Sequence, residues 1–283
     1  MAEPAVQDDL VYDVGMHRGE DTAFYLAKGF RVVAFEANPE LVGLSQRRFG
    51  AEIGTGRLHI VSGAIVAPGS DGRAVRFYKH PERSEWGTMD QAWGRSHGLP
   101  IGEFGMVEVE PIDFARCIRE YGMPYYMKID VEGVDGVCVG TLSSFATRPS
   151  YVSLESERHH FEVLERELDL LESLGYDRFK PVQQAWMDRK EILTQDRRGA
   201  PLRFRFEPHS SGPFGKDLSG DWLTKPQILA RYGRIFWAYR FWANQPLLVH
   251  TRVGRQVRRL ASTFLNRPLP GWYDTHAKHS QAR

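Results

Sequence analysis

The chain has 283 residues, with 37 Lys and Arg against 36 Asp and Glu, so its formal net charge is +1. With 42% hydrophobic and 26% charged residues, it has the composition of a globular protein of one α/β domain with an appendage. No stretch approaches the ~18 apolar residues of a membrane span, and the N-terminus has no apolar signal segment. The only cysteines are Cys117 and Cys138, which predicts a reduced, cytoplasmic compartment.

The near-zero net charge conceals a division of charge along the chain. Residues 1–224 carry 26 basic and 35 acidic side chains, a net charge of −9. Residues 225–283 carry 11 basic side chains and one acidic side chain, Asp274, a net charge of +10. The two parts are therefore expected to meet different partners.

Strand-like apolar runs alternate with helical patterns from the start of the chain. Strands are predicted at 10–15, 31–36, 58–61, 106–109, 125–130 and 151–154. Helices are predicted at 20–28, from Pro39 onward, and at 113–121, 134–143 and 161–174. Residues 66–105 are rich in Gly, Pro and charged residues and predict a flap around a short strand, 74–78. The alternation predicts a mostly parallel sheet covered by helices.

Two further strand-like segments, 178–182 and 202–206, are expected to close this sheet as an antiparallel pair. After residue 207 the pattern changes to a turn-rich linker, two helices at 226–243 and 247–265, and a tail, 267–283, that contains Pro and Gly. We therefore predict a nucleotide-binding domain over residues 1–207 and a basic, aromatic helical extension over residues 208–283.

A glycine turn follows the first predicted strand. Gly15 and Gly19 follow Asp13 there, and Glu36 ends the second strand, where an acidic side chain can hold two ribose hydroxyls. Carboxylates at this turn, Asp13 and Glu20, would repel a pyrophosphate but suit a ligand that carries an ammonium and a sulfonium. The electrostatics favour S-adenosylmethionine over NAD.

Three sequence blocks in order resemble the FkbM-type family of S-adenosylmethionine-dependent methyltransferases: VYDVGMHRGEDT from Val11, VVAFEANPE from Val32 and MKIDVEG from Met127. The resemblance covers roughly residues 10–175. It implies a Rossmann-like class I methyltransferase fold, mostly parallel with an antiparallel last strand. It also implies methyl transfer, mostly to hydroxyl oxygens of sugars or polyketide-like natural products. The chain departs from the family at His17, where a smaller amide such as Asn is frequent.

The resemblance also assigns cofactor contacts by position. Asp13, Gly15, His17 and Gly19 are expected at the methionine portion and Glu36 at the ribose. The main chain of Gly63 and Ala64 is expected beside the adenine. Thr22 is expected to cap the helix or contact the cofactor carboxylate, and a helix-surface threonine is the alternative.

Residues at the carboxyl ends of later strands are candidates for the chemistry, because ligands gather at that edge of the sheet. Asp130 is the first choice for the base that removes the acceptor proton, and a histidine, His159 or His160, is the other. Substrate contacts are expected from a set of four residues: Trp86, Lys128, Glu132 and Glu155. Carboxylates and a histidine also suit Mg²⁺, but no spacing is diagnostic, so no metal ligand is assigned.

The sequence therefore predicts an O-methyltransferase that acts on a small-molecule or glycan hydroxyl, on an acceptor that is free, lipid-linked or phosphate-linked. Methyl transfer to nitrogen or carbon, and a non-catalytic binding module, are the alternatives. The basic tail predicts either a cap or homodimer contact, or a peripheral contact with an anionic membrane. No RNA-binding signature accompanies it, so no nucleic-acid partner is expected.

Overall fold

A computed structural model of the chain describes residues 3–70, 72–82, 87–89, 94–95, 101–131, 133–157, 160–185, 187–242, 256, 260 and 273–282. The chain divides into two compact units. The first comprises Met1–Val152, Glu191–Phe204 and Gln281–Arg283, and the second Ser153–Lys190 and Arg205–Ser280. No helix in the described ranges has both the length and the apolarity that a membrane crossing requires.

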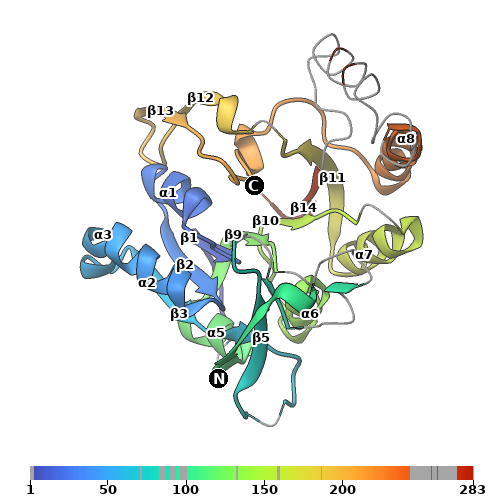
Figure 1. The fold of residues 1–283 in the computed structure, drawn as a ribbon. Coiled ribbons are helices and arrows are strands. Elements are labelled where there is room, and N and C mark those ends of the chain that lie inside the picture. The colour runs from blue at the N-terminus through green and yellow to red at the C-terminus, as the bar shows by residue number, and fades with distance from the viewer. Residues whose placement is uncertain are drawn as a thin grey trace. The chain divides into compact units, whose positions relative to one another are not determined.

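The first unit is built on four parallel strands with helices between them (Figure 1). The strands are β1 (Val6–Val14), β2 (Arg31–Glu36), β3 (Leu58–Ser62) and β9 (Met123–Ile129). The helices are α1 (Glu20–Ala27), α2 (Pro39–Arg48), α3 (Gly50–Gly54), α5 (Phe114–Tyr121) and α6 (Asp135–Thr141), which runs into the 3₁₀ turn η2 (Leu142–Ser144). These elements confirm the strands and helices expected from the apolar periodicity up to residue 144.

Aromatic side chains fill the core of this unit. Tyr12 and Phe35 from adjacent strands lie 5.4 Å apart between ring centroids, and Phe114 from α5 packs edge-on against Phe35 at 5.3 Å. The Tyr12 hydroxyl is fully buried and donates a hydrogen bond of 2.9 Å to the carbonyl of Gly122. A buried tyrosine is stabilised by edge-to-face contacts with other rings and by a hydrogen bond from its hydroxyl group. The core thereby fixes β1 and β2, the two strands that end at the glycine turn and at Glu36.

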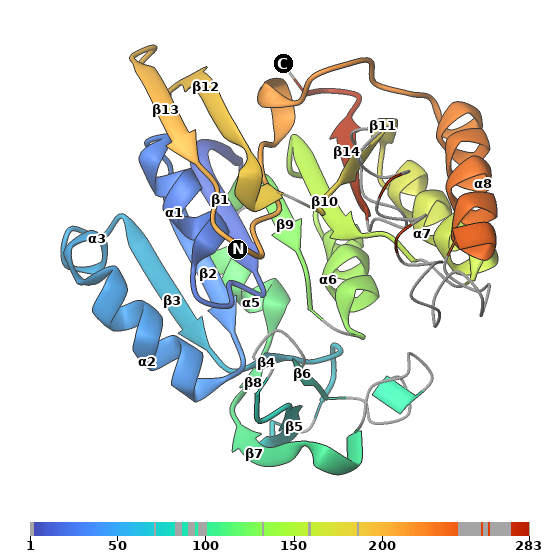
Figure 2. The ribbon, with the colours of Figure 1, turned by 45° about the horizontal axis from the view of Figure 1, so that its top comes forward.

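Two small sheets lie within and on either side of the region 66–105 that was predicted as a flap (Figure 2). One pairs β4 (Ala64–Ile65) with β8 (Pro111–Ile112). The other contains β5 (Val75–Lys79), β6 (Gly87–Thr88) and β7 (Gly105–Val109), which follows the 3₁₀ turn η1 (Ile101–Glu103). The flap is therefore more regular in its described part than its composition predicts.

The second unit contains β10 from Ser153 onward (Tyr151–Glu155 in full), α7 (Phe161–Ser173), β11 (Tyr176–Gln183), α8 (Lys225–Trp242) and β14 (Tyr273–His279), with 3₁₀ turns η3 (Met187–Arg189) and η4 (Gly215–Asp217).

Three buried hydroxyl groups of the second unit form a hydrogen-bond network. The Tyr232 hydroxyl on α8 lies 2.6 Å from that of Ser156 and 2.7 Å from that of Thr275 on β14. The Ser156 and Thr275 hydroxyls are 2.8 Å apart, so each buried hydroxyl has two partners.

The large sheet has seven strands in the order β3-β2-β1-β9-β10-β14-β11. β14 runs antiparallel to β11, with Phe179 opposite Ala277. A mostly parallel sheet with one antiparallel strand is the class I methyltransferase arrangement, and the predicted fold class is confirmed.

The predicted pairing of 178–182 with 202–206 is wrong. Residues 201–205 form β13, which pairs with β12 (Glu191–Gln195) in a separate hairpin. This hairpin packs on α1, where the rings of Phe24 and Phe204 lie 5.0 Å apart and the Lys28 ammonium donates to the carbonyl of Gln195 at 2.7 Å. The true partner of β11 is β14, which lies in the tail for which no strand was predicted. Of the second predicted tail helix, only Gln256 and Leu260 lie within the described residues.

Candidate cofactor site

The turn between β1 and α1 depends on two glycines. Gly15 and Gly19 both have φ of +82°, which residues with a side chain rarely adopt. A Cβ on Gly15 would overlap the carbonyl oxygen of Asp130, and one on Gly19 would overlap the ring of Phe49. The turn therefore lies directly against the residue that follows β9, so the ends of β1 and β9 meet at one site.

A buried ammonium lies at this meeting point. The Lys128 side chain is only 5% exposed, and its Nζ donates to the carbonyl of Gly15 at 3.2 Å. Its Nζ also faces three carboxylates, at 3.6 Å from Asp13 Oδ1, 3.4 Å from Asp21 Oδ2 and 3.3 Å from Asp130 Oδ2. One cation thus faces three anions, and the cluster has an excess of negative charge that suits a cationic ligand.

Asp13 is the most buried member of this cluster, with no exposed surface. Its Oδ2 accepts a hydrogen bond of 2.6 Å from the Thr22 hydroxyl, but its buried Oδ1 accepts none. Burial raises the pKa of Asp13, and Lys128 and Thr22 act in the opposite direction. A buried carboxylate oxygen without a hydrogen bond is costly unless a donor reaches it, so Asp13 fits a ligand ammonium.

Glu36 ends β2 and lies beside the same turn. Its Oε2 accepts from the amide of His17 at 2.9 Å, and its Oε1 accepts from the amide of Asn38 at 2.8 Å. Burial raises the pKa of Glu36 to about 7, although both amides favour the ionised form. Each carboxylate oxygen keeps a further lone pair, so the side chain can accept two hydroxyl hydrogen bonds.

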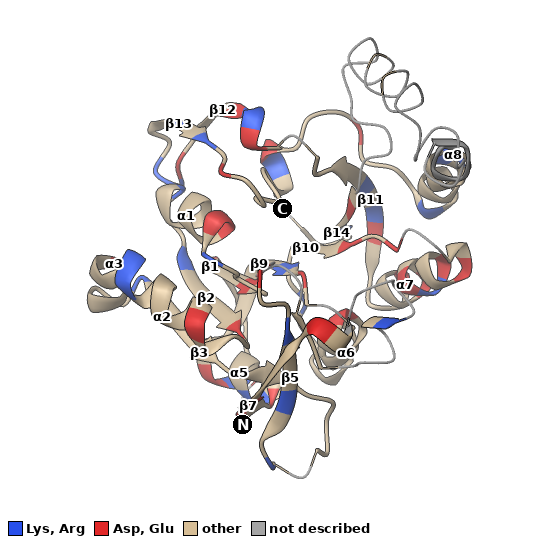
Figure 3. Ribbon diagram, in the orientation of Figure 1, with Lys and Arg blue, Asp and Glu red and all other residues tan. Residues whose placement is uncertain are grey.

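His17 and Glu20 form a pair at the start of α1. His17 Nδ1 lies 3.0 Å from Glu20 Oε1, and the amide of Arg18 donates to Glu20 Oε2 at 3.1 Å. The pKa of Glu20 is lowered because these hydrogen bonds and the His17 charge outweigh burial, which acts to raise it. The acidic first turn of α1 is visible in Figure 3. The expected contact of His17 with the methionine portion stays a prediction.

The turn after β3 depends on Gly63. Gly63 has φ of +140°, and a Cβ there would overlap the carbonyl oxygen of Glu110. The Gly63 amide donates to the carbonyl of Glu36 at 3.0 Å, and the amide of Ala64 donates to Glu110 at 2.9 Å. Gly63 therefore lies against Glu36, the residue that is expected at the ribose. This position is consistent with the expected main-chain contact to the adenine.

The other predicted residues divide between the two units. Asp130 follows β9 and its side chain is 46% exposed, so its carboxylate is accessible to an acceptor. Glu155 ends β10 in the second unit, where the exposed His160 precedes α7 and donates its amide to Glu157 at 3.3 Å. Three expected residues lie outside the described residues: Trp86, Glu132 and His159.

Asp21 is the site residue that the sequence interpretation missed. It is 3% exposed although it lies in the acidic first turn of α1, where carboxylates are usually explained by the helix dipole. The available signal was its position one turn before Phe24 and Tyr25, on a helix that buries most of its residues.

No group of three or more His, Cys, Asp or Glu among the described residues has the geometry to hold a metal ion.

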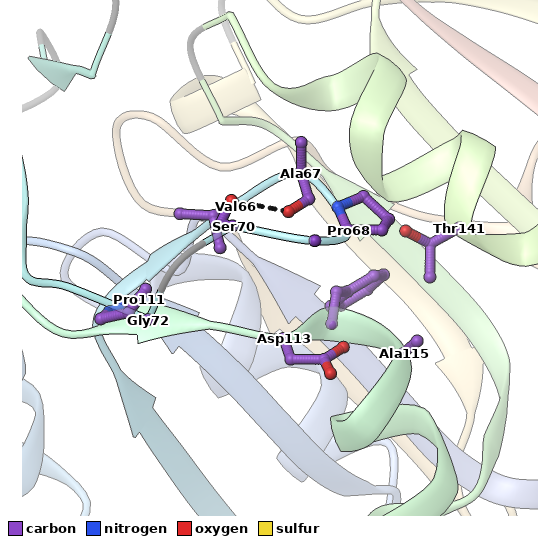
Figure 4. A pocket seen from close by; sticks show the side chains of 11 residues that line it. Val66, Ala67, Pro68, Ser70, Gly72, Pro111, Asp113, Ala115 and Thr141 are labelled. Carbon is purple, nitrogen blue, oxygen red and sulfur yellow. Dashed lines mark hydrogen bonds between the residues drawn. The ribbon is translucent and has the colours of Figure 1, made fainter.

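A small pocket of about 130 Å³ lies elsewhere in the first unit, between the segment after β4, the start of α5 and the end of α6 (Figure 4). Pro68, Phe114 and Thr141 line it, and the Ser70 hydroxyl donates to the carbonyl of Ala67 at 2.8 Å. None of the residues predicted to contact cofactor or substrate lines it, so we assign it no part in the reaction.

A model of the methyltransferase FkbM domain matches residues 13–178, more than half of the chain. This segment contains the glycine turn, Glu36, Lys128 and Asp130. No curated protein sequence matches the chain significantly.

Solved structures with related folds are distant. The S-adenosylmethionine-dependent methyltransferase from Geobacter sulfurreducens in complex with S-adenosyl-L-homocysteine is 11% identical, with 98% of this chain and 86% of that chain covered and a TM-score of 0.36. The YcgJ protein from Bacillus subtilis is 10% identical over 96% and 93%, with a TM-score of 0.36. Precorrin-6y C5,15-methyltransferase from Geobacter metallireducens is 12% identical over 71% and 77%, with a TM-score of 0.35. Likenesses at this level carry no argument about the acceptor.

Proposed function

The chain belongs to the family of methyltransferase FkbM domains, with S-adenosylmethionine as its methyl donor, and we propose that it methylates a hydroxyl oxygen of a saccharide, glycoconjugate or related natural product. The observation that carries the proposal is the accessible carboxylate of Asp130 beside the buried Lys128 cluster. We propose this carboxylate as the proton acceptor, and its position at the carboxyl end of β9, next to the proposed cofactor residues, supports that role.

The excess negative charge of the cluster supports the assignment of cofactor contacts. Asp13 offers its buried Oδ1 to the ammonium, and Glu36 offers lone pairs to the ribose hydroxyls. Both side chains are more than 90% buried, so their interactions are poorly screened by water. We propose that these two carboxylates orient the cofactor, and that the main chain of Gly63 and Ala64 borders the adenine.

S-adenosylmethionine, when bound, would supply an activated methyl group to the acceptor oxygen and leave as S-adenosylhomocysteine. The protein then has to align the acceptor and take its hydroxyl proton. Asp130 is placed for this task, because its carboxylate is exposed on one side and ion-paired with Lys128 on the other. Lys128 holds the carboxylate in place and acts as a positioning residue.

Methyl transfer from labelled S-adenosylmethionine into a cell-envelope glycan extract tests the proposal. We expect label in hydroxyl-linked methyl groups, and we expect Asp130→Asn to lower kcat by about 100-fold or more, the usual contribution of a positioned base. The control Asp135→Asn removes a nearby carboxylate on α6 that accepts from the amide of Val131 at 3.4 Å, and should change kcat less than about threefold.

Three outcomes would contradict parts of this proposal. Full activity of Asp130→Asn would exclude that residue as the base. Label on nitrogen or carbon would exclude hydroxyl methylation. Retained S-adenosylhomocysteine binding without transfer into any fraction would favour a non-catalytic binding module.

The pKa of Glu36 predicts a pH dependence of cofactor binding. The ribose hydroxyls donate to the ionised carboxylate, so protonation of Glu36 opposes binding. Because its pKa is about 7 in the free protein, affinity should fall as pH falls through 7. The fraction ionised drops about tenfold between pH 8 and pH 6, so the Kd for S-adenosylhomocysteine should rise by about that factor. Calorimetry at several pH values measures this.

Glu36→Gln provides the comparison. The amide cannot ionise, so its Kd should be higher than that of the natural chain at pH 8 and nearly constant down to pH 6. A pH dependence that survives in Glu36→Gln would assign the proton to another group, with Asp13 the next carboxyl whose pKa is raised.

A further inference from the structure

Among the described residues, helix α8 contacts the rest of the second unit along one side. Its first residue, Lys225, forms ion pairs with Asp169 and, at 2.7 Å, Glu172 on α7. One turn further, Ile228 is fully buried, and Tyr232 joins the buried hydroxyl network. Phe236 then packs edge-on against Phe161 of α7, with 5.2 Å between ring centroids. This anchored side accounts for the folding of the helix.

The opposite side of α8 is basic and aromatic. Arg231, Arg234 and Trp237 recur at three-residue spacing and are all exposed, and 67% of the Trp237 side chain is accessible to solvent. α8 contains no Asp or Glu (Figure 3). The exposed indole lies next to two guanidinium groups on this side of the helix, so an apolar ring and two positive charges occur together where the folding of α8 requires neither. We call Arg231, Arg234 and Trp237 the outward face.

The sequence around this face has the same character. Residues 225–283 carry 11 basic side chains and one acidic side chain, so the net charge is +10, whereas residues 1–224 have a net charge of −9. The described Leu260 is 70% exposed in this segment. Arginine is attracted to anionic headgroups, and tryptophan prefers the boundary between headgroups and acyl chains.

We propose that the outward face of α8 docks the protein peripherally on an anionic lipid membrane. The arginines contact lipid phosphates, and Trp237 enters the headgroup boundary. Charge alone would attract any polyanion, but the exposed indole of Trp237 adds an apolar contribution that a bilayer satisfies and a soluble polyanion does not. The docking requires no transmembrane helix and no contact by the cofactor residues.

Flotation of the full-length protein with vesicles tests this proposal. Vesicles of phosphatidylcholine with 30% phosphatidylglycerol, about the anionic content of many membranes, should bind at least about tenfold more tightly than vesicles of phosphatidylcholine alone. Binding should weaken as salt increases, because exposed charges are screened. Arg231→Glu with Arg234→Glu should lower affinity at least about tenfold, and Trp237→Ala about fivefold.

The matched control reverses two exposed arginines elsewhere, Arg198 and Arg203 of the β12–β13 hairpin. Arg198→Glu with Arg203→Glu makes the same change in net charge and should retain vesicle affinity within about twofold. Every variant should bind S-adenosylhomocysteine as the natural chain does, which shows that it is folded and separates this proposal from the proposed reaction.

Three results would overturn the docking proposal. An equal loss in the control pair would show that net charge, not the outward face, governs binding. Equally tight binding to soluble heparin that is insensitive to Trp237→Ala would show general polyanion adhesion. A concentration-dependent dimer that buries Trp237 and excludes vesicles would assign the face to a second copy of the chain instead.

Discussion

A chain that ends at residue 272, and so lacks β14, is expected to lose cooperative folding of its second unit. β14 pairs with β11 over residues 273–279, and it contributes three side chains that are at most 1% exposed: Thr275, His276 and Ala277. Its removal leaves the hydrogen-bonding groups of β11 without their partners, and it takes one of two hydrogen-bond partners from each of the buried hydroxyls of Ser156 and Tyr232. Each orphaned buried group costs about 1–3 kcal/mol, and several together approach the ~5–15 kcal/mol that stabilises a domain.

The measurement is soluble yield and thermal unfolding monitored by circular dichroism. A control that ends at residue 280 removes only Gln281, Ala282 and Arg283, and should melt within a few degrees of the full chain. The boundary placed at residue 207 from the sequence makes the opposite prediction, that the preceding domain folds without residues 208–283. A well-folded product of the 272-residue chain would therefore support that boundary and contradict the structural role given to β14.

The elements around the cofactor site were predictable because their sequence signals are local. β1, β2 and β9 are short apolar runs, and their side chains are buried on both faces as parallel strands require. The glycine turn and the acidic end of β2 follow the spacing that is typical of nucleotide-binding strand–helix–strand units. These signals need no knowledge of distant contacts, so the residues in question could be identified before the structure.

β14 could not be predicted in the same way. Its sequence, YDTHAKH, has little apolar character, yet Asp274 and His276 are both buried. Its pairing with β11 spans about a hundred residues of chain, and no local pattern encodes such a partner. The segment 202–206 alternates more regularly and was therefore the better candidate from sequence, but its outward residues are exposed and its inward residues pack on α1 instead.

The cluster around Lys128 also depends on a contact between distant parts of the chain, which no local sequence pattern predicts. The sequence places Lys128 and Asp130 on one face of a strand whose carboxyl end lies beside the methyl donor, and so predicts Lys128 as a substrate contact and Asp130 as the base. Asp21 reaches the same ammonium from the first turn of α1, although more than a hundred residues separate it from Lys128. The packing of α1 beside β1 and β9 brings Asp21 to Lys128. The same packing buries the Lys128 ammonium.

Lys128→Met is expected to be strongly destabilising, and its cost should depend on pH. The substitution keeps the length of the side chain but leaves Asp13 and Asp21, which are 0% and 3% exposed, without their shared cation. Removing one partner of a buried ion pair costs about 3–5 kcal/mol, more than replacing the pair as a whole. Urea unfolding at pH 8 should show a loss of this size.

The sign of the pH dependence follows from Asp13. Burial already raises its pKa, and the loss of the Lys128 charge raises it further. A carboxyl whose folded pKa lies above its unfolded value binds more protons in the folded state, so the protein is destabilised as pH rises through that window. The stability gap between Lys128→Met and the natural chain should therefore narrow as pH falls from 8 toward 5.

Two further variants separate charge from packing. Adding Asp21→Asn to Lys128→Met removes one of the uncompensated anions, and should recover part of the lost stability at pH 8 but less at pH 5. Lys28→Met deletes another buried ammonium, one that donates to the Thr194 hydroxyl and to a backbone carbonyl, and its cost should show little pH dependence. If Lys128→Met and Lys28→Met showed the same cost at every pH, hydrogen bonding and packing rather than the carboxylates around Lys128 would explain why this lysine is buried.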